Sequence, residues 1–258
     1  MSSGALVAFF QYLALAGSAL TAFKLYSSGL YSRYRIFFWY FLFRIPNSIW
    51  PLILDVRSDF YRTVWLLMSP VVWVFYVGVV LELYRLVLER HKGIYSLGRW
   101  TMYAALALSV TISGLTLLPR IRPAMPIVNK EFAFELAAER GIIFSLVLFI
   151  LFILLFLSRY PVRLSRNVVA HVTLYSVYFM TSTVALLLRS LFGMQIARPV
   201  NVALSGISSL CVLGWFFLLN PKGEEVKTNL PHFSPEHEKR LLAQLDALNA
   251  TLLKVSRD

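Results

Sequence analysis

The stretch GIIFSLVLFILFILLFL, Gly141–Leu157, contains no charged residue, and it decides the fold class. A run this long and this apolar can cross the hydrocarbon core of a bilayer as a helix, and we expect it to face lipid more than any other span. Six more apolar runs of comparable length lie at roughly Ala5–Tyr26, Ile36–Leu54, Thr63–Tyr84, Trp100–Leu118, Val168–Leu188 and Pro199–Leu219. The sequence therefore predicts an all-α, polytopic integral membrane protein with seven transmembrane helices.

The composition supports a lipid environment. Hydrophobic residues make up 58% of the chain and the mean hydropathy is +0.67, whereas soluble domains contain about 45–50% apolar residues. The net charge is +12, which we assign to Lys and Arg beside the spans, where they meet anionic lipid head groups. We therefore expect the bilayer as a partner and no nucleic acid. Period-2 alternation is absent from the sequence, which excludes a membrane β-barrel.

The distribution of basic residues predicts the orientation. The first, third and fifth loops and the start of the tail hold twelve Lys and Arg residues, against eight on the other side. By the positive-inside rule the N-terminus is outside and the C-terminus is cytoplasmic, and we expect a bacterial inner (plasma) membrane. Trp39, Trp100 and Trp215 are then predicted at the inner interface, and Trp65 at the outer one.

Outside the spans, two segments have helical character. The loop after the fourth span continues as NKEFAFELAAER, Asn129–Arg140, for which we predict a short interfacial helix. The chain then divides into a transmembrane domain at 1–220, a polar linker at 221–234 and an amphipathic helix at 235–258. Ser234 is a plausible N-cap for that last helix, and Pro235 suits its first position.

The last helix has one apolar seam. It steps by four and three residues through Leu241, Leu245, Leu248, Leu252 and Val255. Three interpretations remain open: packing on the membrane domain or the membrane surface, self-association into a homo-oligomer, and docking of a partner protein's helix.

The second span carries polar groups at membrane depth. In FWYFLFRIPNSIWPLIL, Phe38–Leu54, a charged Arg44 costs at least a few kcal/mol unless it finds a partner, water or the interface. Helical spacing places six residues on one face of this span: Tyr40, Arg44, Asn47, Ser48, Pro51 and Asp55. Because polar groups are costly in lipid, this face should point into the bundle. Pro46 and Pro51 free backbone carbonyls, which indicates either an ordinary packed kink or the wall of a wet cavity.

Glu82 in the third span is the candidate partner of Arg44. The second and third spans are joined by a short loop, and side chains lean toward the N-terminus of their helix, so these two groups can point at one another. The alternative is that Arg44 snorkels to the interface while Glu82 pairs with Arg85, one turn further on.

A second polar stripe follows the sixth span through His171, Tyr175, Tyr178, Ser182 and Arg189. A single membrane histidine is more often a structural residue than a ligand, although His171 could titrate. The predicted ligand-binding residues are Arg44, Asn47, Ser48, Glu82, His171, Tyr175 and Tyr178.

Catalytic signatures are missing from the sequence. It contains no H-E-x-x-H, G-x-S-x-G or G-x-x-x-x-G-K-[ST] motif, no pair of aspartates within the spans, and one cysteine, Cys211. We therefore expect no catalytic residue, no metal and no cofactor. The prediction is a non-enzymatic seven-helix protein of receptor or sensor type, whose last helix contacts a partner or a second copy. The alternatives are a small transporter or channel, or a structural or assembly subunit of a membrane complex.

Overall fold

The computed structural model describes residues 3–55, 58–88, 92–115, 127–159, 163–192, 196–225, 227–229 and 235–255. Within these residues every secondary-structure element is a helix except for one pair of three-residue strands. The long helices are α1 (Ser3–Ser27), α2 (Arg35–Ile53), α3 (Asp59–Val87), α4 (Lys92–Leu115), α5 (Ile127–Arg159), α6 (Arg166–Phe192), α7 (Ala197–Leu218) and α9 (Pro235–Val255). The short elements are η1 (Leu30–Ser32), β1 (Arg163–Ser165), α8 (Lys222–Glu225) and β2 (Lys227–Asn229). The predicted all-α fold is confirmed at this level.

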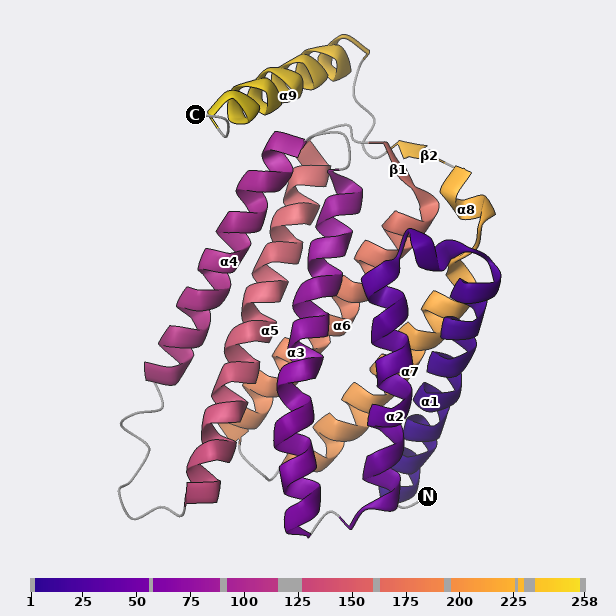
Figure 1. Cartoon of the computed structure of the whole chain (residues 1–258), viewed down its shortest axis with the longest axis vertical. Helices are drawn as coiled ribbons and strands as arrows, with labels where there is room; N and C mark the ends of the chain where they lie inside the picture. Colours follow the sequence, from indigo (N-terminus) through magenta and orange to yellow (C-terminus); the bar gives the residue numbers. More distant parts are fainter. Residues whose placement is uncertain are drawn as a thin grey trace.

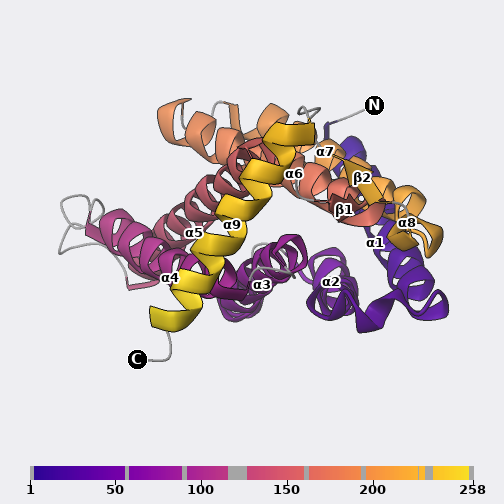
Figure 2. The ribbon, with the colours of Figure 1, turned by 90° about the horizontal axis from the view of Figure 1, so that it is seen from above.

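The helices α1 to α7 stand side by side in a bundle (Figure 1). Helix α1 packs between α2 and α7. Helix α7 in turn packs against α6, and α6 packs against α5. Helix α5 also packs against α3 and α4, so it lies inside the wider half of the bundle (Figure 2). The start of α1 lies at one end, called here the N-terminal end, while α8 and α9 lie at the opposite end, called the tail end (Figure 1).

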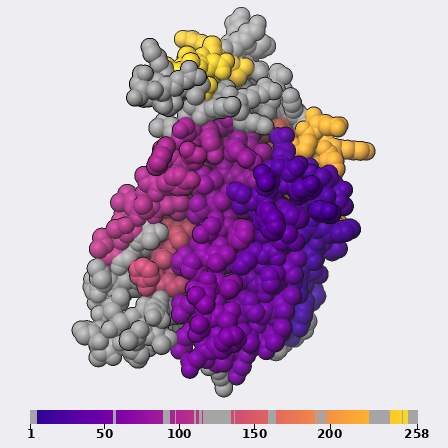
Figure 3. All heavy atoms as spheres, viewed as in Figure 1, coloured from indigo at the N-terminus to yellow at the C-terminus, as the bar shows by residue number. Residues whose placement is uncertain are grey.

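Six of the described helices, α1, α2, α3, α5, α6 and α7, are long and apolar enough to cross a membrane. Large apolar side chains such as Val74 of α3 and Phe217 of α7 are exposed on their outer faces, as lipid contact requires. Figure 3 shows one such face, formed largely by α2 and α3. Helix α4 lies beside α5 but is not among the six, and the predicted end of that span, 116–118, falls outside the described residues. The seven-span count and the orientation remain predictions.

Helix α5 differs from its prediction in two ways. It runs unbroken from Ile127 to Arg159, so the short interfacial helix predicted at 129–140 and the fifth span are one helix. Neither a proline nor a second glycine interrupts it, and the single Gly141 is tolerated. Half of the residues of its apolar segment are buried, more than in any other candidate span. The expectation that this span faces lipid most is therefore wrong, because three neighbouring helices cover it.

Small residues bring α1 and α7 together. A Cβ at Gly17 would lie 2.8 Å from Cγ1 of Val212, so no larger residue fits there without movement. On the same contact, the Ser209 hydroxyl of α7 donates to the carbonyl of Phe10 in α1 at 2.9 Å. Close approach at small side chains, with a hydroxyl bonded across, is typical of helix pairs in membranes.

The tail segment after α7 is partly docked onto the bundle. Within the predicted linker 221–234, α8 and β2 are ordered elements, and β2 pairs antiparallel with β1, Ser165 lying opposite Lys227. Residues 226 and 230–234, which include the proposed N-cap Ser234, lie outside the described residues. The expected amphipathic helix is present as α9 and packs against α4.

The contact between α9 and α4 involves the predicted seam. Leu245 is fully buried and Leu241 is half-buried, whereas the side chains of Leu248 and Leu252 lie outside the described part of the structure. Of the three interpretations, packing on the membrane domain is the arrangement seen within this chain. Self-association and a partner helix remain predictions.

Candidate functional site

A cavity of about 300 Å³ lies between α1, α2, α6 and α7. Its polar lining residues are Gln11, Arg44, Asn47, Ser48, Tyr178, Ser205, Ser208 and Ser209. Four of the predicted ligand-binding residues therefore meet at one place, three from α2 and one from α6. The contribution of α1 comes from its first half and that of α2 from its second half, so the cavity lies toward the N-terminal end of the bundle.

Among the described residues that line the cavity, Arg44 is the only charged one. It lies at the middle of α2, where Nη1 donates to the Tyr40 hydroxyl at 2.9 Å and Nη2 donates to the Ser208 hydroxyl of α7 at 2.9 Å. Its guanidinium also lies 5.9 Å from the centre of the Tyr40 ring. Within the described part of the chain no carboxylate forms an ion pair with Arg44. Two neutral hydroxyl groups thus hold a full positive charge in the middle of a helix that can cross a membrane.

Tyrosines surround the guanidinium on the side of α3 and α6. The hydroxyls of Tyr76 and Tyr178 are 2.6 Å apart and hydrogen-bonded, and the Tyr76 ring packs on Tyr40 with centroids 5.9 Å apart. This contact fixes the position of the Tyr178 ring at the cavity wall. Tyr76 and Ser208 were not among the predicted site residues. Each lies on a polar position of an otherwise apolar span, but only the packing of α2 against α3 and α7 shows that it reaches Arg44.

The other polar side chains of the cavity have spare hydrogen-bonding groups. Asn47 accepts a hydrogen bond from Trp50 Nε1 at 3.1 Å through its carbonyl oxygen, so its amide protons do not take part in that contact. Ser48 lies one residue further along the same helix and also lines the cavity. Gln11, another residue that was not predicted, adds an amide from α1. Asp55, placed on the same predicted stripe, is exposed at the end of α2 and does not line the cavity.

Glu82 does not pair with Arg44, so the predicted interhelical ion pair is wrong. Instead its two carboxylate oxygens accept hydrogen bonds from the backbone amides of Ile36 and Phe37, each at 3.0 Å. Nη2 of Arg85 lies 3.8 Å from the same carboxylate, which agrees with the alternative prediction that Glu82 pairs with Arg85. The first amides of a helix have no partner within the helix, and the residue before α2, Tyr34, provides no side-chain cap. A carboxylate from α3 therefore caps α2.

His171 and Tyr175 also lie away from the cavity. They belong to an aromatic core in the tail half of the bundle, formed by Tyr34, Phe37, Phe41, His171, Tyr175, Phe179 and Trp215, all fully or almost fully buried. The His171 ring lies edge-on to Phe37 at 4.1 Å between centroids, and Tyr175 lies 4.6 Å from Trp215. In the described structure His171 Nδ1, the Tyr175 hydroxyl and Trp215 Nε1 have no hydrogen-bond partner. Ring packing closes this half of the interior.

Trp215 therefore does not mark a membrane interface, contrary to its prediction, since 1% of its surface is exposed. The tryptophans Trp39 and Trp100 do lie on the outside of the bundle, 60% and 65% exposed. The sequence could not show which of these three tryptophans faces the interior of the bundle.

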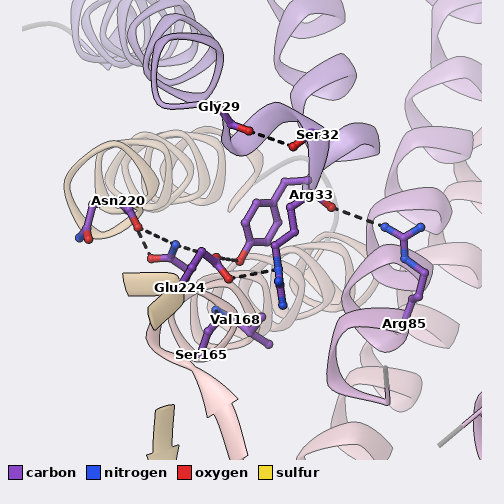
Figure 4. Close-up of polar contacts among 10 residues, drawn as sticks. Gly29, Ser32, Arg33, Arg85, Ser165, Val168, Asn220 and Glu224 are labelled. Carbon is purple, nitrogen blue, oxygen red and sulfur yellow. Dashed lines mark hydrogen bonds and ion pairs between the residues drawn. The ribbon is translucent and has the colours of Figure 1, made fainter. Parts of the chain in front are cut away.

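At the tail end a group of polar residues ties four elements together (Figure 4). We call Arg33, Tyr34, Asn167 and Glu224 the tail clasp. Glu224 of α8 accepts hydrogen bonds from the Tyr34 hydroxyl and, at 2.7 Å, from the Asn167 amide, and it lies 3.1 Å from Nε of Arg33. Asn167 also donates to the carbonyl of Asn220 at 2.8 Å. Burial, together with the neighbouring carboxylate, raises the pKa of Tyr34, so its hydroxyl stays protonated as a donor.

The tail clasp was not predicted, and of its four residues only Glu224 lies in the tail segment NPKGEE, Asn220–Glu225. A Cβ at Gly223 would lie 2.2 Å from the Asn167 side-chain oxygen, so a larger residue would have to displace the Asn167 side chain. Asn167, at the start of α6, is completely buried. The sequence could not reveal this contact because the partners lie far apart along the chain.

Two acidic residues of α5 lie toward the N-terminal end but outside the Arg44 cavity. Glu135 is buried, which raises the pKa of its carboxyl, and the Ser69 hydroxyl opposes this shift. Glu139 lies one turn further along the helix, half-buried. Arg189 of α6 hydrogen-bonds to Asn201 of α7. None of these charged residues lines the cavity, so none of them balances Arg44 there.

Comparison of the chain with protein-family models, with curated proteins and with solved structures finds no significant match. The functional argument therefore depends on the geometry of the cavity and its surroundings.

Proposed function

We propose that this chain is a non-enzymatic membrane protein of receptor or sensor type, which binds a ligand in the Arg44 cavity. The observation that carries the proposal is a guanidinium in the middle of α2 that lines a cavity of about 300 Å³ and has only hydroxyl partners among the described residues. An uncompensated arginine at membrane depth costs at least about 2.5–3.5 kcal/mol. A purely structural arginine would be expected to recover that cost from a carboxylate, and a bound ligand could supply the missing partner.

The closed aromatic core favours ligand binding over permeation. Toward the tail end the interior between α2, α6 and α7 is filled by packed rings, among them Phe37, Phe41 and Trp215. The cavity wall itself is built from residues nearer the N-terminal end. Access from one side is the arrangement expected of a binding site, whereas a channel or transporter needs a route from both sides, in one state or in alternating states.

Helix α2 offers a physical connection from the cavity to the tail. Its middle carries Arg44, and its first turn is held by Glu82 of α3. Directly before α2, Arg33 and Tyr34 join the tail clasp with Glu224. A ligand that moves α2 by a small amount would therefore change contacts at the tail end, which a sensor requires.

The remaining parts of the proposal concern topology and partners. We place the protein in a bacterial inner membrane with seven spans, the N-terminus and cavity on the outer side and the tail in the cytoplasm, from the distribution of Lys and Arg. In this arrangement α9 contacts a partner protein or a second copy when it leaves α4, because the buried Leu245 side of its seam would then be free.

Cysteine accessibility tests the proposal. Ser48→Cys, in a Cys211→Ala background, is treated with a membrane-impermeant thiosulfonate added to either side of sealed vesicles. The matched control is Val212→Cys, at a fully buried position of α7. We expect labelling of the thiol introduced at position 48 from the N-terminal side only and no labelling of the control.

Labelling from both sides would favour a transporter or channel instead. Labelling from neither side, together with a clear loss of stability in Arg44→Ala, would indicate a scaffold protein and contradict the proposed function.

A further inference from the structure

The Arg44 guanidinium has hydrogen-bonding capacity that the protein leaves unused. Arginine carries five N–H donors in a flat fork. One donor on Nη1 goes to Tyr40 and one on Nη2 goes to Ser208, and no described residue accepts from the remaining three. Because a donor that lacks a partner at membrane depth is costly, the free part of the fork calls for an acceptor from outside the chain.

The charge of the cavity restricts that acceptor. Its described lining contains one guanidinium, no carboxylate, no lysine and no second arginine. A ligand with a single negative charge would neutralise the site, whereas a dianion would leave an excess negative charge at membrane depth, and a cation would add to the positive one. Two oxygens of one planar group match the arginine fork best, and a carboxylate provides them.

The rest of the wall indicates the body of the ligand. The amides of Gln11 and Asn47 and the hydroxyls of Ser48 and Ser205 can bind polar substituents. The apolar lining consists of Phe10, Ala14, Pro51 and Leu204. If each non-hydrogen atom takes as much room as a water molecule in the liquid, about 30 Å³, a volume of about 300 Å³ holds on the order of ten such atoms.

We infer that the Arg44 cavity binds a small organic monocarboxylate, with the carboxylate on the Arg44 fork and a short, partly apolar body between Phe10 and Leu204. This inference rests on the proposed function and names its class of ligand. A lipid phosphodiester is also a monovalent oxyanion, but a cavity of this volume holds at most its head group.

Matched ligand pairs test the inference on the unmodified protein. The full chain is reconstituted in zwitterionic phosphatidylcholine nanodiscs, and binding of benzoate and hexanoate is compared with that of benzamide and hexanamide by thermal shift. The members of each pair have nearly the same shape and differ in charge. We expect the carboxylates to bind at least about tenfold more tightly, as hydrogen bonds to a charged group imply.

Variants assign the preference to Arg44. Arg44→Gln should abolish the difference between carboxylate and amide, and Arg44→Lys should keep part of it, since it retains the charge without the fork. The matched control is Arg62→Gln, at an exposed arginine of α3 outside the cavity, which should change neither affinity. If Arg44→Gln does not fold, the paired ligands on the unmodified protein still decide the question.

A second measurement compares reaction rates at the cavity and needs no ligand at binding equilibrium. The introduced thiol of the Ser48→Cys variant should react faster with an anionic thiosulfonate than with a cationic one, after both rates are normalised to those of free cysteine. Adding Arg44→Lys to this variant should preserve the preference, while adding Arg44→Gln should remove it.

The failures of the two proposals are distinguishable. If the thiol of Ser48→Cys is accessible but amides bind as well as carboxylates, or benzamidine binds better than benzoate, the carboxylate inference is overturned and the binding site stands. If phosphatidylglycerol in the nanodisc displaces benzoate in an Arg44-dependent way, a lipid head group is the natural occupant and the free carboxylate is overturned. If that thiol is inaccessible and no ligand binds, the proposed function itself fails.

Discussion

Removing the carboxylate of Glu82 tests the capping of α2 by α3 directly. This side chain is 4% exposed, and its two oxygens accept the amides of Ile36 and Phe37 at 3.0 Å each. The variant Glu82→Ala leaves both amides without a partner at the first turn of a packed helix. Phe37 is completely buried, so water cannot readily replace the bond to its amide.

The expected cost follows from these two bonds. A hydrogen bond to a charged group contributes about 1.5–3 kcal/mol, so losing both should lower the free energy of unfolding by about 3–6 kcal/mol. Glu82→Gln keeps one oxygen acceptor and turns an amide group toward the second backbone N–H. Its cost should therefore be about half as large.

Unfolding in mixed micelles with increasing SDS, followed by far-UV circular dichroism, measures these differences. The control is Glu225→Ala, which removes an exposed carboxylate from α8 and should change stability by less than about 0.5 kcal/mol. A loss below about 1 kcal/mol for Glu82→Ala would refute the capping argument, because two amides, one of them fully buried, cannot lose their acceptors at so low a cost.

The same assay separates this arrangement from the ion pair with Arg44. Arg44 bonds to Tyr40 and Ser208, and it shares no partner with Glu82 among the described residues. The effects of Arg44→Ala and Glu82→Ala should then add to within about 0.5 kcal/mol. A coupling energy above about 1 kcal/mol between the two substitutions would favour the direct pair.

Three other substitutions have defined outcomes. Tyr34→Phe removes a donor to Glu224 in the tail clasp, which should cost about 1–2 kcal/mol and speed proteolysis of the tail. Since the folded pKa of Tyr34 is raised above its usual value near 10, the contribution of its hydroxyl is fully present below pH 10 and falls as the pH rises further, a dependence that the variant should lack in alkaline unfolding. Gly17→Ala places a methyl group against Val212 and should destabilise the α1–α7 contact by about 1–3 kcal/mol in the SDS assay, whereas a neutral effect would contradict close packing there. Leu245→Asp should release α9 from α4, detectable as faster hydrogen exchange in the tail helix with the bundle unchanged, and equal exchange would show that this contact is weak.

The sequence alone determined the class of fold and one face of the site. Long apolar runs dictate membrane-compatible helices because the backbone must satisfy its own hydrogen bonds in lipid. Helical spacing placed Arg44, Asn47 and Ser48 on a single face of α2, and this face does line the cavity. These inferences depend on the repeat of one helix, which is the same in every protein.

The tertiary structure decided which groups each polar side chain contacts and which helices lie beside one another. Glu82 was predicted to reach Arg44, yet its carboxylate binds the backbone amides at the start of α2. His171 faces inward as expected but packs among aromatic rings instead of lining the cavity. The most apolar span is central because α3, α4 and α6 surround it. Each outcome depends on the tilt, offset and rotation between helices, and those quantities follow from the packing of the whole bundle rather than from the pattern of any one segment.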